Sequence, residues 1–245
     1  MPVIQNPAER AARTAQKRHA LLRFLRDELY TTPAVAGLVI GVGERAARST
    51  ISAMERADLV RRHVVTVVEG LPPVTLVAIT PHGQAMAFDP ATEAVIDRIY
   101  EPGRYSLIHL SHRLDTQRLR LQAVNSGRVV KWLAGEAMGA NAKNIKRPDA
   151  VLLTAERVRV AVEIERSIKN KKRYAGILSG HLTAIKQAKW QRVVWASPDA
   201  EMARRVEAIL KSIGRAQIAG VDTKLTPEHF KPLIFTTYQD FVHNL

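Results

Sequence analysis

The chain has 245 residues, of which 46% are hydrophobic and 24% charged, and its formal net charge is +14. These values argue against a disordered protein and are typical of a globular chain of one large domain or two of ordinary size. The absence of cysteine excludes disulfides and cysteine-ligated zinc, and no apolar run reaches the roughly 18 residues of a membrane span. The first residues carry charges where a signal peptide has its apolar core, so a soluble cytoplasmic protein is expected.

The first ninety residues predict three helices followed by two strands. Leucines recur along one side of residues 7–29, Thr32-Pro33 provides an N-cap and a first-turn proline for a helix over 34–40, and a third helix is expected over 44–57. The runs 59–68 and 74–80 predict strands joined by the loop EGLPP, residues 69–73. This is the element order of a winged helix-turn-helix, expected over 1–90, and the closing ITPHGQAMA resembles the segment that follows the wing in many regulators of that family.

In such a domain the third helix enters the major groove of DNA and the wing contacts the backbone. The prediction for the third helix is therefore that its polar side faces DNA through Arg45, Arg48, Ser49 and Ser52. Phosphate contacts are expected from Arg61 and Arg62 in the following strand. The alternative is a protein-interaction or dimerisation module, which the near balance of 12 basic and 10 acidic residues over 1–100 leaves open.

The domain boundary is placed at residues 89–106, which hold two proline-containing turns around a predicted short helix, and a second domain is expected over 104–245. Its predicted order is a helix (107–124), strands (129–133, 150–153 and 158–164), a helix (170–188), a strand (192–196), a helix (199–213), a strand (233–238) and a short last helix. This alternation predicts an α/β sandwich with a mixed sheet. The whole chain is thus expected to combine α+β and α/β parts.

Positive charge is concentrated in this second domain. Residues 143–192 hold 13 Lys and Arg but only 4 Asp and Glu, and three of these acids are Asp149, Glu163 and Glu165. Nucleic acid is the polyanion that such a surface most often binds. The alternative is a solvated basic face without a partner.

Glu163 and Glu165 lie at the end of a predicted strand rich in valine. Strand alternation places the β-branched residues at even positions on a core face and the two glutamates on the opposite face, about 7 Å apart. Carboxylates this close repel each other unless a divalent cation joins them or one is protonated. Asp149 begins the preceding strand, and it shares the face of Glu163 if the hairpin has an odd loop, such as 155–157, or a bulge.

Three carboxylates are sufficient for Mg²⁺ or Mn²⁺, which keeps several waters. Lys169 follows four residues after Glu165, where an ammonium group would offset charge that develops on a phosphate. These residues therefore indicate metal-assisted phosphodiester chemistry. The alternative is a solvated strand edge whose acids pair with Arg159, Lys169 and Arg173.

The set Pro148-Asp149, Glu163, Glu165 and Lys169 resembles the PD-(D/E)xK motif of the restriction-endonuclease-like fold, with Glu165 at the usual lysine position and the lysine displaced to Lys169. The form PDA…VEIExxxK…Y is similar to plasmid replication-relaxation proteins and MobC-type mobilisation relaxases. Those proteins also couple an N-terminal winged helix to such a domain. The helix HLSHRLDTQRLRL, with His109 followed six residues later by Asp115, resembles one of their helices.

The resemblance implies a bacterial cytoplasmic relaxase that nicks plasmid DNA at an origin of transfer. It implies that Asp149, Glu163 and Glu165 hold Mg²⁺ or Mn²⁺ and its water, and that Lys169 stabilises the transition state. The expected partners are double-stranded DNA and other relaxosome or coupling proteins, without a membrane; a homodimer is left open. The alternative is a non-catalytic DNA-binding accessory protein or a plasmid regulator.

Several further residues are predicted to assist. Lys171, Lys172 and Arg173 follow the motif and are expected to contact DNA. Gln117 is a candidate for an additional polar contact at the site. His109, with His112, is a candidate metal ligand, against the alternative of an ordinary helix histidine. For Tyr174, packing or a phosphate contact is favoured over a role as covalent nucleophile.

Overall fold

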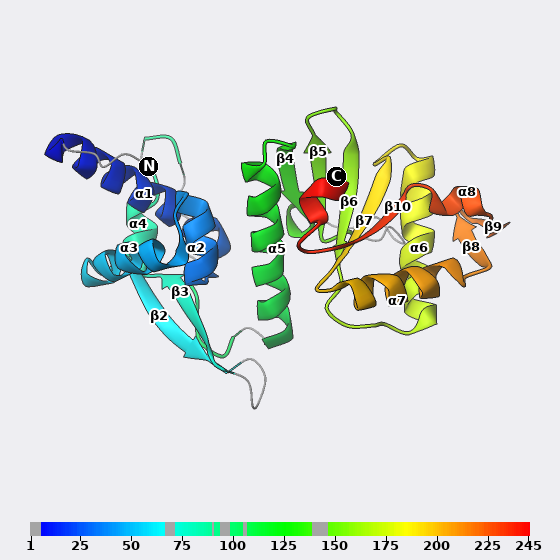
Figure 1. The fold of residues 1–245 in the computed structure, drawn as a ribbon, viewed down its shortest axis with the longest axis horizontal. Helices are drawn as coiled ribbons and strands as arrows, with labels where there is room; N and C mark the ends of the chain where they lie inside the picture. The colour runs from blue at the N-terminus through cyan, green and yellow to red at the C-terminus, as the bar shows by residue number, and fades with distance from the viewer. Residues whose placement is uncertain (1–5, 67–71, 90, 94–98, 105–106, 139–146) are drawn as a thin grey trace. The chain divides into compact units, whose positions relative to one another are not determined.

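A computed structural model of the chain describes residues 6–66, 72–89, 91–93, 99–104, 107–138 and 147–245. Its contacts divide the chain into two compact units, residues 1–121 and 122–245. In the described residues these units contain eight α-helices and ten strands, and the largest sheet has five strands of mixed direction (Figure 1). The chain is therefore a mixed α+β protein.

The first unit contains a small antiparallel sheet of three strands in the order β1-β3-β2. The elements predicted there are confirmed: helices at 7–28, 33–40 and 44–56 and strands at 60–65 and 74–79. The predicted wing loop and the short helix predicted within 89–106 fall largely outside the described residues. Two elements were not predicted, the short strand β1 and helix α4. In chain order the elements are α1 (Pro7–Glu28), β1 (Tyr30–Thr31), α2 (Pro33–Ile40), α3 (Glu44–Arg56), β2 (Val60–Val65), β3 (Val74–Ile79), α4 (Pro81–Met86) and α5 (Leu107–Asn125).

The ends of α2 follow from its sequence. The hydroxyl of Thr32 accepts a hydrogen bond from the amide of Val35, and Pro33 occupies the first turn. Gly41 ends the helix in the left-handed region with φ 65°, a conformation that glycine adopts without the usual steric cost. These signals hold α2 to eight residues and direct the chain into α3.

Helix α3 is amphipathic and buries one side. Ala47, Ile51 and Met54 recur at helical spacing, are fully buried, and pack in one cluster with Leu21 and Leu25 of α1. Because this stripe faces the core, the residues between its members face away from it. The polar side of α3 predicted from the sequence is therefore confirmed.

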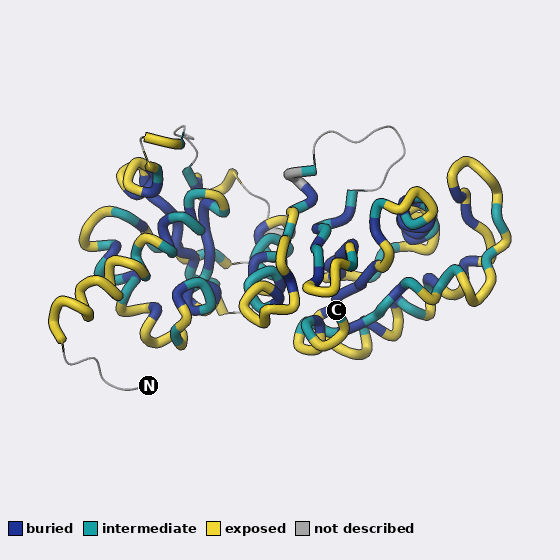
Figure 2. The backbone as a smooth tube through the Cα atoms, turned by 90° about the horizontal axis from the view of Figure 1, so that it is seen from above, coloured by how far each residue is buried: buried dark blue, intermediate teal, exposed yellow. Residues whose placement is uncertain are grey.

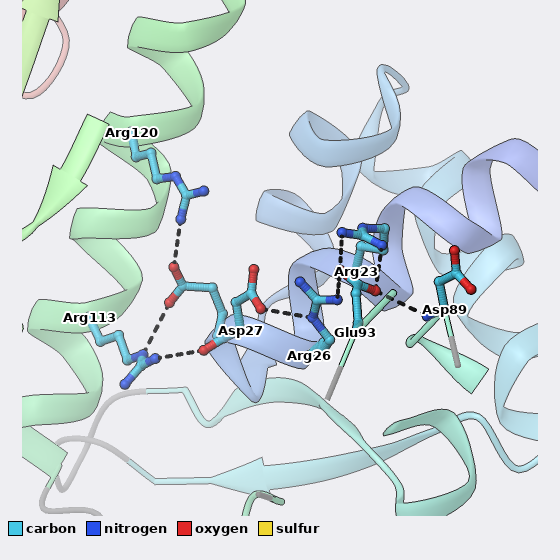
Figure 3. Close-up of polar contacts among 8 residues, drawn as sticks. Arg23, Arg26, Asp27, Asp89, Glu93, Arg113 and Arg120 are labelled. Carbon is cyan, nitrogen blue, oxygen red and sulfur yellow. Dashed lines mark hydrogen bonds and ion pairs between the residues drawn. The ribbon is translucent and has the colours of Figure 1, made fainter. Parts of the chain in front are cut away.

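Helix α5 is tied to the end of α1 by a polar network. Glu28 accepts hydrogen bonds from Arg113 and Arg120 at 3.1 Å, and Figure 3 shows these two arginines of α5 directed toward α1. The amide of Gln117 is buried and donates to Glu28 and to the carbonyl oxygen of Tyr30. The first unit consequently extends to Leu121, later than the boundary at 89–106 expected from the sequence.

The second unit is built on a five-stranded sheet in the order β10-β7-β6-β5-β4. Strand β5 is antiparallel to both of its neighbours, β4 and β6, whereas β6, β7 and β10 are parallel. Its elements are β4 (Val129–Ala134), a 3₁₀ turn (Gly135–Met138), β5 (Ala150–Thr154), β6 (Arg159–Ile164), α6 (Lys171–Lys186), β7 (Arg192–Ser197), α7 (Ala200–Lys211), β8 (Arg215–Ile218), β9 (Val221–Lys224), α8 (Pro227–Phe230), β10 (Leu233–Thr237) and a 3₁₀ turn (Phe241–Asn244).

Most elements of the second unit match those predicted for this part of the chain, namely the strands 129–134, 150–154, 159–164, 192–197 and 233–237 and the helices 171–186 and 200–211. The hairpin β8-β9 was not predicted. It turns at Ala219 and Gly220, both at positive φ, which is the two-residue turn typical of hairpins.

Helices α6 and α7 cover the same face of the large sheet. Leu178 of α6 and Leu210 of α7 share a buried cluster with Ala161 of β6 and Trp195 of β7. The central strands are buried, whereas the helices each expose one side (Figure 2).

The strand β6 is buried on both faces, which corrects the alternation predicted from the sequence. Val160, Val162 and Ile164 are buried as expected, but Ala161 and Glu163 on the opposite face are also buried. The reason is α6, which covers the face opposite the predicted core face. Both glutamates of the predicted site consequently lie under protein rather than on a solvated sheet.

Candidate functional site

The hairpin between β5 and β6 brings Asp149 beside Glu163. Ala150 pairs with Val162 in the antiparallel ladder, so the preceding residue lies opposite Glu163. The loop has three residues, 155–157, closed by a 2.9 Å hydrogen bond from the amide of Thr154 to the carbonyl oxygen of Val158. Arg157 adopts a φ of 66°, the left-handed residue that ends a three-residue hairpin loop. The odd loop required by the sequence analysis is confirmed.

Asp149 is held against β6 by two hydrogen bonds. Its amide donates to the carbonyl oxygen of Val162 at 3.0 Å, and its Oδ2 accepts from the amide of Ile164 at 2.7 Å. The end of β4 packs closely here, because a Cβ atom at Gly135 would lie 2.1 Å from the carbonyl oxygen of Pro148. The Asp149 carboxylate is therefore fixed at the strand that carries both glutamates.

Glu163 is paired with a histidine of α6. Its Oε1 lies 2.9 Å from Nε2 of His181, and both side chains are almost fully buried. The imidazole ring lies edge-on to Trp190 and Trp195, with ring centroids 5.6 and 5.7 Å away. The Nδ1 atom of His181 is buried without a hydrogen-bond partner. The ring is thus confined by tryptophans and anchored through Nε2.

Glu165 is paired with Lys169, as the four-residue spacing predicted. The Glu165 side chain is fully buried, and its Oε2 accepts from Nζ of Lys169, whereas Oε1 is buried without a hydrogen-bond partner. Burial raises the pKa of the Glu165 carboxyl, the Lys169 ammonium opposes this, and the negative charges of Glu163 and Asp149 raise the pKa further. The three carboxylates therefore act on one another electrostatically.

Tyr174 completes the surroundings of Glu165. Its ring is fully buried at 6.0 Å from the ring of Trp195, and its hydroxyl accepts from the amide of Lys169 at 3.4 Å. Burial, followed by the charge of Glu165, raises the pKa of the Tyr174 phenol to about 12. A buried and protonated phenol suits packing, the role favoured in the sequence analysis, rather than nucleophilic attack.

The donor set fits a hard divalent cation in its chemistry. It consists of three carboxylates, one of which has a buried oxygen without a partner, and Mg²⁺ and Mn²⁺ prefer oxygen ligands. Among the residues that the structure describes, no group of three His, Asp or Glu side chains is placed ready to hold a metal ion. Lys169 and His181 instead hold Glu165 and Glu163.

Basic side chains surround the first turn of α6. Lys171, Lys172 and Arg173 are exposed, and Asn170 caps the helix by accepting from the amide of Arg173 at 2.8 Å. The ammonium group of Lys171 donates to the carbonyl oxygen of Ser212 at 2.9 Å. Cations at a helix N-terminus oppose the helix dipole, so these side chains do not stabilise α6 through its dipole.

The residues predicted to read DNA lie on α3 and β2 of the first unit. Arg45, Arg48 and Ser49 are exposed, and Arg48 pairs with Glu44 one turn earlier. Ser52 and Arg62 are instead half-buried and bonded to each other at 2.8 Å.

Arg62 also pairs with Glu55, whereas Arg61 is exposed and lies 4.0 Å from Asp58. Arg45, Arg48, Ser49 and Arg61 are thus presented at the surface. Ser52 and Arg62 tie β2 to α3.

Two of the residues predicted to assist, Gln117 and His109, belong to the first unit. Gln117 is buried, and its hydrogen bonds go to Thr31, Glu28 and the carbonyl oxygen of Tyr30. Its amide is used within the first unit, and its suggested polar contact at the carboxylate site stays a prediction. His109 is exposed on α5 and belongs to the same unit.

His181 was missed by the sequence analysis, although helix spacing contains a signal for it. Tyr174, Leu178 and His181 recur at i, i+4 and i+7, and all three are buried. A histidine within an apolar stripe faces the core, where its ring nitrogens require partners. The sequence does not show that the partner is Glu163, because eighteen residues separate the two.

A surface cavity of about 530 Å³ lies elsewhere in the second unit. Its lining comes from α7, α8, β10 and the chain between them, including Lys211, Phe230 and Lys231. None of the predicted site residues lines it. The carboxylates are therefore not part of this cavity.

No family model, curated protein or solved structure matches the chain. Within the described part of the chain, no helix combines the length and apolar character needed to cross a membrane.

Proposed function

We propose that the chain is a metal-dependent DNA endonuclease that nicks one strand of a duplex. The observation that carries the proposal is the meeting of Asp149, Glu163 and Glu165 at the adjoining ends of β5 and β6, with Lys169 bonded to Glu165. Burying Glu163 and Glu165 beside the half-buried Asp149 is costly, because like charges repel, unless the three carboxylates serve a cationic ligand.

The architecture of both units supports this function. A sheet of three antiparallel strands, continued in parallel by β7 and β10 after α6, agrees with a restriction-endonuclease-like domain. Three helices followed by an antiparallel strand pair agree with a winged helix-turn-helix in the first unit. A DNA-reading unit would then be joined to a cutting unit in one chain.

The residues have separable roles in this proposal. Asp149, Glu163 and Glu165 would hold Mg²⁺ or Mn²⁺, which when bound polarises a phosphate and lowers the pKa of a water. Lys169, already beside Glu165, would stabilise negative charge on the phosphate. The exposed Lys171, Lys172 and Arg173 would bind the DNA backbone.

The biological setting follows from the resemblance described in the sequence analysis. A winged helix joined to a PD-(D/E)xK domain supports plasmid mobilisation, with nicking at an origin of transfer in a bacterial cytoplasm. Relaxosome and coupling proteins would be the protein partners. Self-association into a homodimer is compatible with this setting.

A second function, a DNA-binding accessory protein without catalysis, is favoured by one observation. Glu163 and Glu165 are each bonded to a basic or imidazole side chain, so the fold satisfies them in part without a metal. In that case the acids would be structural, and the arginines of α3 and the basic turn of α6 would carry the function.

Nicking of a supercoiled plasmid separates the two functions. The plasmid carries a candidate origin of transfer and is incubated with the protein and Mg²⁺ or Mn²⁺, with EDTA in the control. Open circles that form only with the metal support the endonuclease. Retarded but intact supercoiled plasmid under all conditions supports the accessory protein.

A further inference from the structure

We infer that His181 is a positioning residue for the metal site: its Nε2–H holds the carboxylate of Glu163 in the orientation that binds the cation. This inference rests on the proposed function and deepens it, because it assigns a role to a residue outside the sequence motif. The hydrogen bond spans 2.9 Å from α6 to β6.

The surroundings of His181 fix its orientation. The ring is fully buried and lies edge-on to Trp190, two residues before β7, and to Trp195 within β7. Close packing leaves little room for the ring to turn. In the described part of the chain, Nδ1 has no hydrogen-bond partner, so the ring is held by the hydrogen bond between Nε2 and Glu163.

The tautomer follows from this geometry. A carboxylate accepts, so Nε2 carries the proton and Nδ1 bears the lone pair. A buried lone pair without a donor costs less than a buried charged N–H without an acceptor. The ring therefore donates to Glu163 through Nε2.

Glu163 accepts a hydrogen bond from this donor. Its carboxylate is almost fully buried. Asp149 lies opposite Glu163 across the hairpin, and Glu165 follows two residues later in the sequence. Hydrogen bonds to ligating carboxylates orient them, and loss of such outer partners typically lowers metal affinity by about 10–100-fold. A core built only for stability would have no need of this pair, because apolar residues of similar size can replace a buried polar pair without loss.

Asparagine and glutamine at position 181 form a matched pair of test variants. Both are neutral amides, but the amide nitrogen of glutamine lies at the distance of Nε2 from the backbone, whereas that of asparagine lies at the distance of Nδ1. His181→Gln therefore keeps a donor for Glu163, and His181→Asn removes it. Glu163→Ala serves as the reference for loss of the ligand itself.

Binding of Mn²⁺ to the full-length protein without DNA is measured from the free-ion signal in electron paramagnetic resonance, and thermal unfolding of each variant is recorded in parallel. The inference predicts about 10–100-fold weaker Mn²⁺ binding for folded His181→Asn and near wild-type affinity for His181→Gln. Wild-type Mn²⁺ affinity in folded His181→Asn, with affinity lost in Glu163→Ala, would overturn the inference and leave the endonuclease proposal intact. Absence of Mn²⁺ binding by the wild-type protein would overturn both.

Discussion

Oδ2 of Asp149 accepts a hydrogen bond from the backbone amide of Ile164 at 2.7 Å, which ties the first acid of the motif to the strand between the two glutamates. This contact gives Asp149 a structural role beside its proposed role as a metal ligand. The two roles depend on different properties of the side chain, because the hydrogen bond requires an oxygen acceptor and the metal requires a negative charge.

Asp149→Ala and Asp149→Asn should separate these roles. Alanine leaves the Ile164 amide without its acceptor and should lower the free energy of unfolding by about 1–3 kcal/mol, whereas asparagine keeps an acceptor oxygen and most of the stability. Both variants should lose nicking by more than about 100-fold, beyond the effect expected for an outer partner. Urea unfolding and plasmid nicking measure the two effects. Full nicking by Asp149→Asn would argue against a metal ligand at this position.

The register of this hairpin could be predicted because it depends on local rules. Asp149 and Glu163 share a face only with an odd loop, and the chain provides one at 155–157 with Arg157 at positive φ. Helices α1, α2 and α3 of the first unit were likewise predictable from caps and apolar spacing. The hairpin β8-β9 also has a local signal, its Ala219-Gly220 turn, which was not used.

The remaining features depend on contacts between distant parts of the chain. Gln117 meets Glu28 and Tyr30, nearly ninety residues away, so its partners could not be read from its own helix. The burial of Glu163 depends on α6 lying over β6, and the alternation of apolar and polar residues within β6 contains no information about that helix. For the same reason His181 was missed.

Lys169→Ala should impair nicking and slightly weaken DNA binding. Its ammonium group is bonded to the buried Glu165, and loss of a donor that stabilises developing charge typically costs about 10²–10³ in rate. Lys224→Ala is the matched control, since it removes the same charge from an exposed position on β9. Equal effects of the two substitutions on nicking would show that Lys169 acts only through the overall positive charge of the protein and not at the reacting phosphate.

Arg45→Ala and Arg48→Ala should each weaken binding to the cognate DNA site by about 1–3 kcal/mol per lost base contact, with binding to random DNA largely retained. Both residues are exposed on α3, and the Arg48–Glu44 pair is exposed enough to exchange readily for DNA. Fluorescence anisotropy with both DNAs measures the effect, and Arg13→Ala, exposed on α1, is the control. Equal losses on cognate and random DNA would assign these arginines to phosphates.

Glu93→Gln should alter the acid stability of the first unit. Arg23, the amide of Asp89 and Arg26 donate to Glu93 and lower the pKa of its carboxyl from 4.5 to about 2 (Figure 3). Between these pH values the folded carboxyl is ionised and the unfolded one protonated, so unfolding takes up a proton and stability falls as the pH falls through this window.

Removal of the carboxyl should therefore lower stability at neutral pH and flatten its decline between pH 4.5 and about 2. Denaturant unfolding at a series of pH values checks this, with Glu9→Gln at an exposed position of α1 as control. An unchanged pH profile in Glu93→Gln would show that the ion pairs are not maintained in solution.

Metal-dependent nicking by a matched pair of glutamate variants tests the central claim most directly. Glu163→Ala removes a buried carboxylate of the proposed metal site, whereas Glu156→Ala removes an exposed carboxylate from the turn of the same hairpin. On supercoiled plasmid with Mg²⁺ or Mn²⁺, Glu156→Ala should produce open circles at the wild-type rate and Glu163→Ala none, with its DNA binding unchanged or slightly tighter because a negative charge near the phosphates is lost. Full metal-dependent nicking by Glu163→Ala would contradict the endonuclease assignment.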